Sequence, residues 1–537
     1  MILVLTGCHI NPRPQNNPND PGAGTTGPYV LISTPADGEE EVSVSTDITV
    51  HFSDNLNEAS VTSDTFSVRD GSGTVSGNLE VSSWEEYTYE TDRITFEPAV
   101  DLSYGTEYTV TLTTGICDFD GNGMDADYSF SFTTCDVRRI ETNDGEAYEP
   151  RIEMDGSGNA FVVWHQLYDT NNCDIWSNAY TTGSGWGTAE RIEADTGDAR
   201  YPEISVNDGG EAMAVWHQSD GTRYNIWANR YTGTGWSTAV EVDSDDTGDA
   251  EYPHVDMNDS GDAVAVWQQS DGSIYSIWAN QYTSGSGWQG AEVIDSEATY
   301  NALAPRVAVD SSGNAIAVWK QYDGSVYSIW SNRYVAGSGW LSAAALELDD
   351  AGSAEKLQID IDDNDNVHVV WRQSDGSVYN IWTRLYTNGS GWGSVEVLET
   401  GSDTCDDPYI DVSGNGHAAA TWWSDHDVSV NRYTPAGGWV TAESLAYDSS
   451  YGDNLTAPSI AVNDSENAAA VWRHYESYSS DEIRSKRFSA SAGEWDSSSS
   501  ILDITDGEVE STRVDIDGSG NVIAVWEQDN DIWAHRF

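Results

Sequence analysis

Basic side chains are scarce in this sequence. It has 23 Lys and Arg residues against 90 Asp and Glu residues, and its formal net charge at pH 7 is -67. Proteins bind phosphate backbones through faces rich in Lys and Arg, which this composition does not supply. We therefore exclude nucleic acid as a partner. Strong self-repulsion favours a soluble monomer, and we expect a saline or divalent-rich medium in which that repulsion is screened.

Helical periodicity and long hydrophobic runs are also missing. Apolar residues alternate with polar ones in short segments separated by Gly, Asp, Asn and Ser, which is the pattern of β-strands and turns. No stretch beyond the N-terminus approaches the ~20 apolar residues of a transmembrane helix. The sequence therefore predicts an all-β protein whose only membrane attachment is a lipid anchor.

Cysteine occurs only five times. Cys117 and Cys135 flank the last predicted hairpin of an N-terminal module, where a disulfide and a pair of free thiols remain equal alternatives. Cys173 and Cys405 fall in non-adjacent copies of a repeat, so we do not expect them to pair.

The most prominent feature of the sequence is a repeat of about 52 residues. One copy, residues 304–340, contains four alternating segments separated by turns. A fixed period of this size, built from four short strands, is typical of β-propeller blades. The most constant position is a Trp after a run of small apolar residues, found at Trp164, Trp216, Trp267, Trp319, Trp371, Trp422, Trp472 and Trp526.

The two ends of the repeat region indicate how it closes. The last copy stops at Phe537 after its third strand, and the segment from Val137 to Thr142 ahead of the first copy is similar to a fourth strand. Pairing these parts leaves no free sheet edge. We therefore predict an eight-bladed β-propeller over residues 136–537, closed by pairing of N- and C-terminal strands.

Residues 1–27 are interpreted as the remnant of a lipoprotein signal and a flexible linker. Leu5-Thr6-Gly7-Cys8 resembles the lipobox of bacterial lipoproteins, which implies a lipid on Cys8 and a place at the cell envelope. This segment lacks a basic region and is short for a signal peptide, so we expect a late or truncated start. An incidental cysteine is the alternative. Pro, Asn and Gly dominate the predicted tether, residues 9–27.

Residues 28–135 lack the repeat and have the pattern of a β-sandwich of about seven strands. The predicted strands cover residues 29–33, 47–53, 65–69, 93–97, 108–113 and 128–133. The module resembles bacterial Ig-like domains of S-layer type in Thr34-Pro35-Ala36-Asp37-Gly38, Tyr104-Gly105-Thr106-Glu107-Tyr108 and Ser129-Phe130-Ser131-Phe132-Thr133. This resemblance implies a spacer or adhesive stalk at the cell surface, without catalysis.

One turn of this module has the alternating oxygen donors of a calcium loop, at Asp118, Asp120 and Asn122. The Glu that closes an EF-hand is absent, and no helices are expected around the turn. Ordinary turn hydrogen bonding is the alternative, and we favour it. No other cofactor or metal is predicted.

The turn between the first two strands of a copy reads Asp155-Gly156-Ser157-Gly158-Asn159, with related sequences in the other copies. This motif loosely resembles the Asp-box of sialidase-type propellers, although the Trp here follows about nine residues after the Asp. In that family the box is a structural turn, so the resemblance implies a role in folding.

In a propeller the first strand of each blade is innermost, so its polar residues border the central channel. The predicted channel-lining residues are Arg151, Asp256, Arg306, Asp360, Asp411, Arg513 and Asp515. Propeller hydrolases of sialidase type need an arginine cluster, a carboxylate acid/base and a nucleophile in one pocket. We keep hydrolysis as an alternative and favour a solvated channel. No single copy differs from the others in the way expected of a copy that carries an active site.

Six Trp residues follow Gly at the start of the predicted fourth strand: Trp186, Trp236, Trp288, Trp340, Trp392 and Trp439. Exposed Trp faces stack on sugar rings, and neighbouring turn carboxylates accept hydroxyl hydrogen bonds, here from Asp220, Asp271, Asp323 and Asp375. Filling of gaps between blades is the alternative role of these Trp residues. We predict a surface-bound or secreted adhesion lipoprotein that binds an extracellular glycan or surface polymer, with a sialidase-like hydrolase and an inert scaffold as alternatives.

Overall fold

A computed structural model describes residues 27–537 except for positions 43, 45, 72, 87–88, 101, 104, 135–136, 143–144, 168–171, 194–195, 244–246, 296–298, 348–351, 400, 402, 449–454, 478–479 and 504–506. The chain divides into two compact units, Met1–Val137 and Arg138–Phe537. The predicted lipidation site Cys8 and nearly all of the predicted linker lie outside the described residues. Within the described part of the chain, no helix has the length and hydrophobicity needed to cross a membrane.

The first unit is a sandwich of two four-stranded sheets. Their strand orders are β1 (Val30–Thr34), β3 (Ile48–Phe52), β6 (Tyr89–Pro98), β5 (Gly77–Glu86), and β2 (Glu39–Val42), β8 (Tyr128–Thr134), β7 (Glu107–Leu112), β4 (Phe66–Arg69). A single 3-10 turn covers Glu58–Ser60. Side chains alternate along a strand, so Val50 and Phe52 of β3 reach the core between the sheets.

The sequence does not predict β2 and β5, so its estimate of about seven strands is one short of the eight in the described residues. Both missed strands lie at a sheet edge. Edge strands carry charge and need less regular alternation than central strands. The segment of β2 reads Glu-Glu-Glu-Val and therefore has no strand-like pattern.

The predicted calcium turn is held by hydrogen bonds within itself. Asp118 accepts from the backbone N–H of Asn122 through Oδ1 and from its side-chain amide through Oδ2, both at 2.8 Å. Burial raises the pKa of Asp118, but these hydrogen bonds outweigh burial and hold the pKa below its ordinary value. The structure therefore favours turn hydrogen bonding over a calcium site at Asp118, Asp120 and Asn122. Cys117 has a free thiol, so it is not in a disulfide; Cys135 lies outside the described residues.

The second unit consists of eight antiparallel sheets in its described residues. Their first strands are β10 (Ala147–Met154), β15 (Ala199–Val206), β19 (Ala250–Met257), β24 (Ala302–Val309), β29 (Ala354–Ile361), β33 (Cys405–Val412), β38 (Leu455–Val462) and β43 (Val509–Ile516). Their second strands are β11 (Ala160–Leu167), β16 (Ala212–Ser219), β20 (Ala263–Ser270), β25 (Ala315–Tyr322), β30 (Val367–Ser374), β34 (Ala418–Ser424), β39 (Ala468–Ser477) and β44 (Val522–Gln528).

The third strands and short outer strands complete each sheet. The third strands are β12 (Cys173–Thr181), β17 (Tyr224–Tyr231), β21 (Tyr275–Thr283), β26 (Tyr327–Val335), β31 (Tyr379–Thr387), β35 (Asp427–Thr434), β40 (Ser480–Ser489) and β45 (Asp531–Arg536). The outer strands are β9 (Arg138–Arg139), β13 (Gly185–Trp186), β14 (Glu190–Arg191), β18 (Val240–Glu241), β22 (Gly287–Trp288), β23 (Glu292–Val293), β27 (Gly339–Trp340), β28 (Ala344–Ala345), β32 (Gly391–Val397), β36 (Gly438–Trp439), β37 (Glu443–Tyr447), β41 (Glu494–Trp495) and β42 (Ser500–Ile501).

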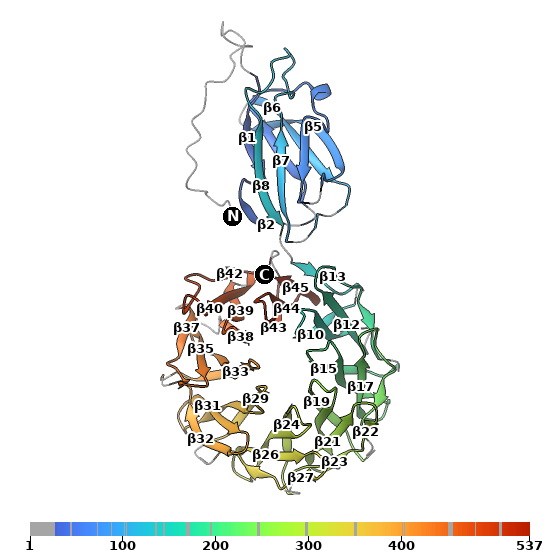
Figure 1. The fold of residues 1–537 in the computed structure, drawn as a ribbon, viewed down its shortest axis with the longest axis vertical. Helices are drawn as coiled ribbons and strands as arrows, with labels where there is room; N and C mark the ends of the chain where they lie inside the picture. The colour runs from blue at the N-terminus through green and yellow to red at the C-terminus, as the bar shows by residue number, and fades with distance from the viewer. Residues whose placement is uncertain are drawn as a thin grey trace. The chain divides into compact units, whose positions relative to one another are not determined.

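The eight sheets are arranged in a ring, with the first strands toward its centre and the short outer strands at its perimeter (Figure 1). Each first strand contacts the first strand of the next sheet, and β43 contacts β10. The second strands lie between neighbouring sheets and are therefore apolar on both faces, as in β20, where seven of eight residues are buried.

The segment that precedes the first sheet lies beside the last strand of the chain. β9 pairs antiparallel with β45, with Arg139 opposite Trp533. The Ile140 N–H donates to the Ile532 carbonyl at 2.9 Å. On the other side, the Asn178 amide of β12 donates to the Ile140 carbonyl at 2.8 Å. An Asn at the same register in the second sheet binds the preceding outer segment in the same way.

The constant Trp of the repeat forms the centre of each sheet's packing. All eight are fully buried. The indole N–H of Trp164 donates to the Gln166 side-chain carbonyl two residues later, at 3.2 Å. The same bond recurs from Trp216, Trp267, Trp319, Trp371 and Trp526. A buried polar group needs such a partner, which explains why Gln accompanies Trp in these copies.

Every first strand carries a β-bulge at one shared position. The residue there has a positive φ of 44–54° in all eight sheets, at Glu149, Tyr201, Tyr252, Ala304, Lys356, Asp407, Ala457 and Ser511. The pairing with the second strand shifts register at this point, for example between Tyr148 and Arg151. A bulge re-aims the side chains that follow it, and the next residues on each strand line the centre of the ring.

Candidate ligand site in the central channel

The first strands enclose a cavity of about 610 Å³ that is lined by all eight sheets of the second unit. Because side chains alternate along a strand, every second residue faces this cavity. Its charged lining residues lie in two successive rows of the first strands and in the turns that follow these strands, which add Asp155, Asp208, Asp259, Asp362, Asp363, Asp365, Asp464 and Asp517. The arginine row consists of Arg151, Glu203, His254, Arg306, Gln358, Tyr409 and Arg513, and the carboxylate row consists of Glu153, Ser205, Asp256, Ala308, Asp360, Asp411 and Asp515.

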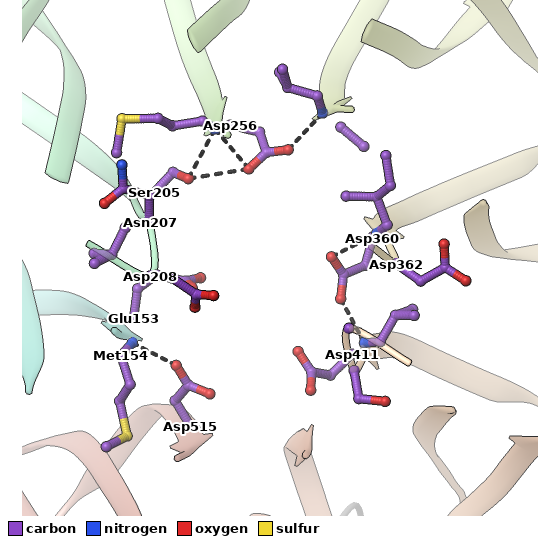
Figure 2. Close-up of a pocket in the computed structure, with 18 of the residues that line it drawn as sticks. Glu153, Met154, Ser205, Asn207, Asp208, Asp256, Asp360, Asp362, Asp411 and Asp515 are labelled. Atoms are coloured by element: carbon purple, nitrogen blue, oxygen red, sulfur yellow. Dashed lines mark hydrogen bonds between the residues drawn. The ribbon is translucent and has the colours of Figure 1, made fainter. Parts of the chain in front are cut away.

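The carboxylate row joins neighbouring sheets, and its labelled members surround the open centre in Figure 2: Glu153, Ser205, Asp256, Asp360, Asp411 and Asp515. Asp256 Oδ2 accepts from the Val309 N–H of the next sheet at 2.6 Å. The same bond runs from Val412 to Asp360, from Val462 to Asp411 and from Met154 to Asp515. Asp256, Asp360 and Asp515 also accept the N–H of the residue that follows each of them. These carboxylates therefore have a structural role.

Burial raises the pKa values of the acidic side chains in the carboxylate row. It raises the pKa of Asp256 and of Asp515 to about 6, and that of Asp360 to about 8. Burial, and after it the neighbouring carboxylates, also raise the pKa values of Glu153 and Asp411 well above the ordinary range. Among the described residues, no three His, Cys, Asp or Glu side chains are arranged to hold a metal ion.

The three arginines of the arginine row have a common orientation. In Arg151, Arg306 and Arg513, Nη1 donates to the carbonyl of the preceding residue at 3.1, 3.1 and 2.7 Å. Arg151 also forms an ion pair with Glu203, with 3.1 Å between Nε and Oε2. In the described part of the chain, neither Arg306 nor Arg513 has a carboxylate within ion-pair distance. Of the three guanidiniums in this row, only that of Arg151 is paired with a carboxylate.

Neutral side chains accompany the two unpaired guanidiniums. Arg306 Nε donates to Gln358 at 3.4 Å, and the Arg513 guanidinium lies 5.5 Å from the centre of the Tyr409 ring. Burial, and after it the charge of Arg306, lowers the pKa of His254 to about 3, so this imidazole is neutral. Burial also raises the pKa of Tyr409, which keeps its hydroxyl protonated.

The electrostatics of the arginine row favour a bound anion. Burial raises the pKa of Glu203, but Arg151 and the other cations outweigh burial and bring it to about 2. Burial, and after it the charge of Arg151, lowers the pKa of Arg513 to about 10, so Arg513 stays charged at neutral pH. The arginine row thus carries an excess of two positive charges at pH 7, in a protein with a net charge of -67.

The six Trp residues that were predicted to bind sugars lie at the perimeter of the ring, away from the channel. Trp186 is buried, with 8% of its surface exposed. Trp340 packs against Tyr334 of its own sheet, with ring centres 5.5 Å apart. The packing corrects the prediction of an exposed face for Trp186. The gap-filling alternative is favoured because each of the partly buried residues packs against a hydrophobic cluster built from its own sheet and the preceding one: Trp236, Trp288, Trp340, Trp392 and Trp439.

The predicted turn carboxylates are bound to their own turns. Asp323 Oδ1 accepts from the N–H groups of Ser325 and Val326 at 2.7 and 2.9 Å. Asp220, Asp271 and Asp375 accept equivalent bonds. These hydrogen bonds lower the pKa of each carboxylate. A role in ligand binding remains a prediction, because one oxygen of each is used by the turn.

The polar groups of the Asp-box-like turns also form hydrogen bonds within their own turns. Asp155 accepts from the N–H of Ser157 and of Asn159 through Oδ1 and from the Asn159 amide through Oδ2, at 2.7–2.9 Å. Gly158 has a φ of 77°, which an L-residue adopts at a cost. The motif is a hairpin turn whose first Asp is held by the turn itself, and Asp155 and Asp517 of two such turns also line the channel cavity.

The predicted channel-lining residues do meet in one cavity. The prediction did not include Glu203, although it occupies the register of Arg151 in its own strand. That shared register was the available signal. What the sequence does not contain is the pairing of the charges, which depends on side-chain reach across neighbouring sheets.

Comparison with solved structures finds distant similarities. A protein of unknown function from Dyadobacter fermentans aligns at 12% identity and a TM-score of 0.36, over 57% of this chain and 98% of that one. A leech intramolecular trans-sialidase aligns at 9% identity and a TM-score of 0.37, over 87% and 92%. A polysaccharide lyase, an ulvan lyase, aligns at 10% identity and a TM-score of 0.40, over 74% and 94%. These TM-scores are too low to support an argument about this chain.

None of the curated proteins matches the chain. A family model does match its N-terminal part, over residues 24–134. These residues include both sheets of the sandwich, β1 to β8. The first unit of this chain is a bacterial Ig-like domain.

Proposed function

We propose that the second unit is an eight-bladed β-propeller, closed by pairing of β9 with β45, and that its arginine row binds an acidic saccharide outside the cell. Cys8 carries a lipid, residues 1–27 form the tether, and the Ig-like domain is a spacer that presents the propeller at the cell surface. The protein acts in binding or adhesion and not as an enzyme.

The charge of the arginine row carries this proposal. Arg151, Arg306 and Arg513 face one cavity, with Glu203 as the only carboxylate of their row. An enclosed cation without a counter-charge is unfavourable, and a bound anion removes that cost. A carboxylate or sulfate group accepts two parallel hydrogen bonds from one guanidinium, which adds geometric specificity.

The size and lining of the cavity support a saccharide as the carrier of that anion. A volume of about 610 Å³ suits a ligand of two or three sugar rings. Gln358, His254 and Tyr409 offer neutral donors and acceptors beside the guanidiniums, as sugar hydroxyls require. The net charge of -67 repels anions at a distance, but the screening length falls from ~8 Å at 0.15 M salt to ~3 Å at 1 M.

Titration of the full chain with three trisaccharides of equal length tests the proposal: one of uronic acid, one sulfated and one neutral. We expect the uronic acid or the sulfated trisaccharide to bind at least tenfold more tightly than the neutral one, because only they offer an anion. Equal affinities for all three, or no binding to any of them, would leave the scaffold alternative.

Hydrolysis is the second candidate, because the carboxylate row lies one step, roughly 7 Å, along the strands from the arginine row. Some glycosidases use a Tyr nucleophile, and Tyr409 lines the cavity next to the carboxylate row. However, no carboxylate of the described residues accepts a hydrogen bond from its hydroxyl, and burial raises its pKa. Binding is therefore better supported. Cleavage of a sialoside by the wild type that is lost in Arg306→Ala would instead establish the hydrolase.

A further inference from the structure

A second cavity, of about 450 Å³, lies among the last sheet and the first two sheets of the second unit. Its walls come from strands β10, β11, β12, β15, β43 and β44. The lining residues that decide its chemistry are Tyr148, Glu149, His165, Arg200, Tyr201 and Glu527. We call it the Cys173 pocket, after the lining residue whose small side chain opens it.

Cys173 stands at a register position where four other sheets have Tyr. It pairs with Leu167 at the end of the hairpin, and the residues at the same place in β17, β21, β26 and β31 are Tyr224, Tyr275, Tyr327 and Tyr379. In the second sheet, the Tyr224 ring covers His217, with ring centres 4.5 Å apart. A thiol cannot cover the equivalent His165 in this way, so a cavity opens beside that imidazole.

The last sheet brings two like charges together at the wall of this pocket. Glu510 lies directly opposite Glu527 across β43 and β44. Like charges in this arrangement destabilise a strand pair. In the fifth sheet the same register holds Glu355 and Arg372, which form an ion pair at 3.0 Å. The last sheet has a second carboxylate where the fifth sheet has the cation.

No side chain of the pocket supplies the missing cation. Glu527 is 7% exposed, and within the described residues its only hydrogen bond comes from the Glu149 N–H at 3.4 Å. Arg200 is already paired with Asp198 at 2.8 Å. His165 is 4% exposed, and its Nδ1 has no hydrogen-bond partner in the structure.

The remaining groups favour an ammonium ion over other cations. Burial, and after it the charge of Arg200, lowers the pKa of His165 to about 3, so the imidazole is a neutral acceptor for an N–H donor. Tyr148 and Tyr201 lie on either side of His165, with ring centres 5.6 and 6.1 Å from the imidazole. Aromatic faces attract organic ammonium groups and pack against a sugar ring or an alkyl chain.

We propose that the Cys173 pocket binds a protonated amine carried on a group about the size of one sugar ring, with Glu527 and Glu149 as the carboxylates that meet the ammonium. An amino sugar and an alkylamine, such as a lysine side chain, share this chemistry. The proposal does not depend on what the arginine row binds, because no residue lines both cavities.

Calorimetric titration of the full chain with glucosamine, N-acetylglucosamine, glucose and n-butylamine tests the proposal. We expect glucosamine or butylamine to bind at least tenfold more tightly than the two compounds without an ammonium group. Tighter binding of glucosamine assigns the site to amino sugars, and equal or tighter binding of butylamine assigns it to alkylamines.

Two variants place the binding in the pocket. Cys173→Tyr fills it with the residue of the equivalent positions, and Glu527→Gln introduces the residue found at the same register in β20, Gln268. Either change is expected to abolish amine binding, while the exposed-strand control Glu396→Gln and the channel variant Arg306→Gln leave it unchanged. Amine binding that is no tighter than glucose binding, or that survives in both folded variants, would overturn the proposal.

Discussion

The two polar rows of the channel differ in how they use their charges. In the carboxylate row Asp stands at four of the seven positions, and each of these Asp side chains accepts a hydrogen bond from a backbone N–H of the next sheet. In the arginine row the residue type changes from sheet to sheet, and Arg306 and Arg513 have no carboxylate partner among the described residues. In a repeat protein, polar groups that recur hold the fold together, and polar groups that diverge on a shared wall are available for binding.

The largest effect is expected when a member of the carboxylate row is removed. Asp360→Ala leaves the Ile361 and Val412 N–H groups without an acceptor. Each unsatisfied buried donor costs about 1–3 kcal/mol, so the free energy of unfolding should fall by about 2–6 kcal/mol in urea titrations. The exposed control Asp125→Ala should change it by less than about 0.5 kcal/mol. A loss for Asp360→Ala as small as that of the control would contradict a structural role.

The reverse result is expected in the arginine row. Arg513→Gln removes one unpaired guanidinium, so the affinity for an acidic trisaccharide should fall by about tenfold to a hundredfold, the worth of about 1.5–3 kcal/mol for a hydrogen bond to a charged group. The free energy of unfolding should change little, since Arg513 has no ion pair to lose. Arg333→Gln, in β26 and outside the channel, is the matched control and should keep full affinity.

The pH dependence of stability distinguishes the rows as well. Folding raises the pKa of Asp360 to about 8 and the pKa values of Asp256 and Asp515 to about 6, from about 3.9 in an unfolded chain. The folded state then binds more protons, so this stability is present below pH ~4 and is lost as pH rises through 6 and 8. Urea titrations at pH 4.5, 6 and 8 should show a steady decrease, and Asp360→Asn should flatten its upper part.

The smallest effect is expected at Glu203, the carboxylate of the arginine row. Glu203→Gln removes a negative charge next to Arg151 and leaves a neutral group of the same shape. The affinity for an acidic trisaccharide should rise by a few-fold, because a third guanidinium becomes available. An unchanged or lower affinity would indicate that Glu203 itself contacts the ligand.

Much of the fold can be predicted from the sequence because the same pattern occurs in eight copies of the repeat. The buried Trp, the Asp-to-Asn turn and the alternating first strand recur, and each has the structural place that its pattern indicates. The edge strands β2 and β5 could not be predicted, since charged or small residues suffice where only one neighbour pairs. The strand β9 could be predicted only from the similarity of its segment to the fourth strand of the other copies.

The candidate site was only partly predictable for a related reason. Alternation along the first strands places Arg151, Arg306 and Arg513 in the channel, and the structure brings them together. Whether a charge is paired depends on the neighbouring sheet, as in the pair formed by Arg151 and Glu203, and no single strand contains that information. Exposure of Trp186 depends in the same way on the packing of its own sheet, where a Tyr covers its ring.

An experimental structure of the full chain with a bound uronic acid trisaccharide tests the central claim most directly. The account predicts the sugar in the central channel, with a carboxylate group about 3 Å from the guanidinium nitrogens of Arg306 and Arg513. A trisaccharide stacked instead on Trp340 or its counterparts at the perimeter, with the arginine row free of it, would contradict the account.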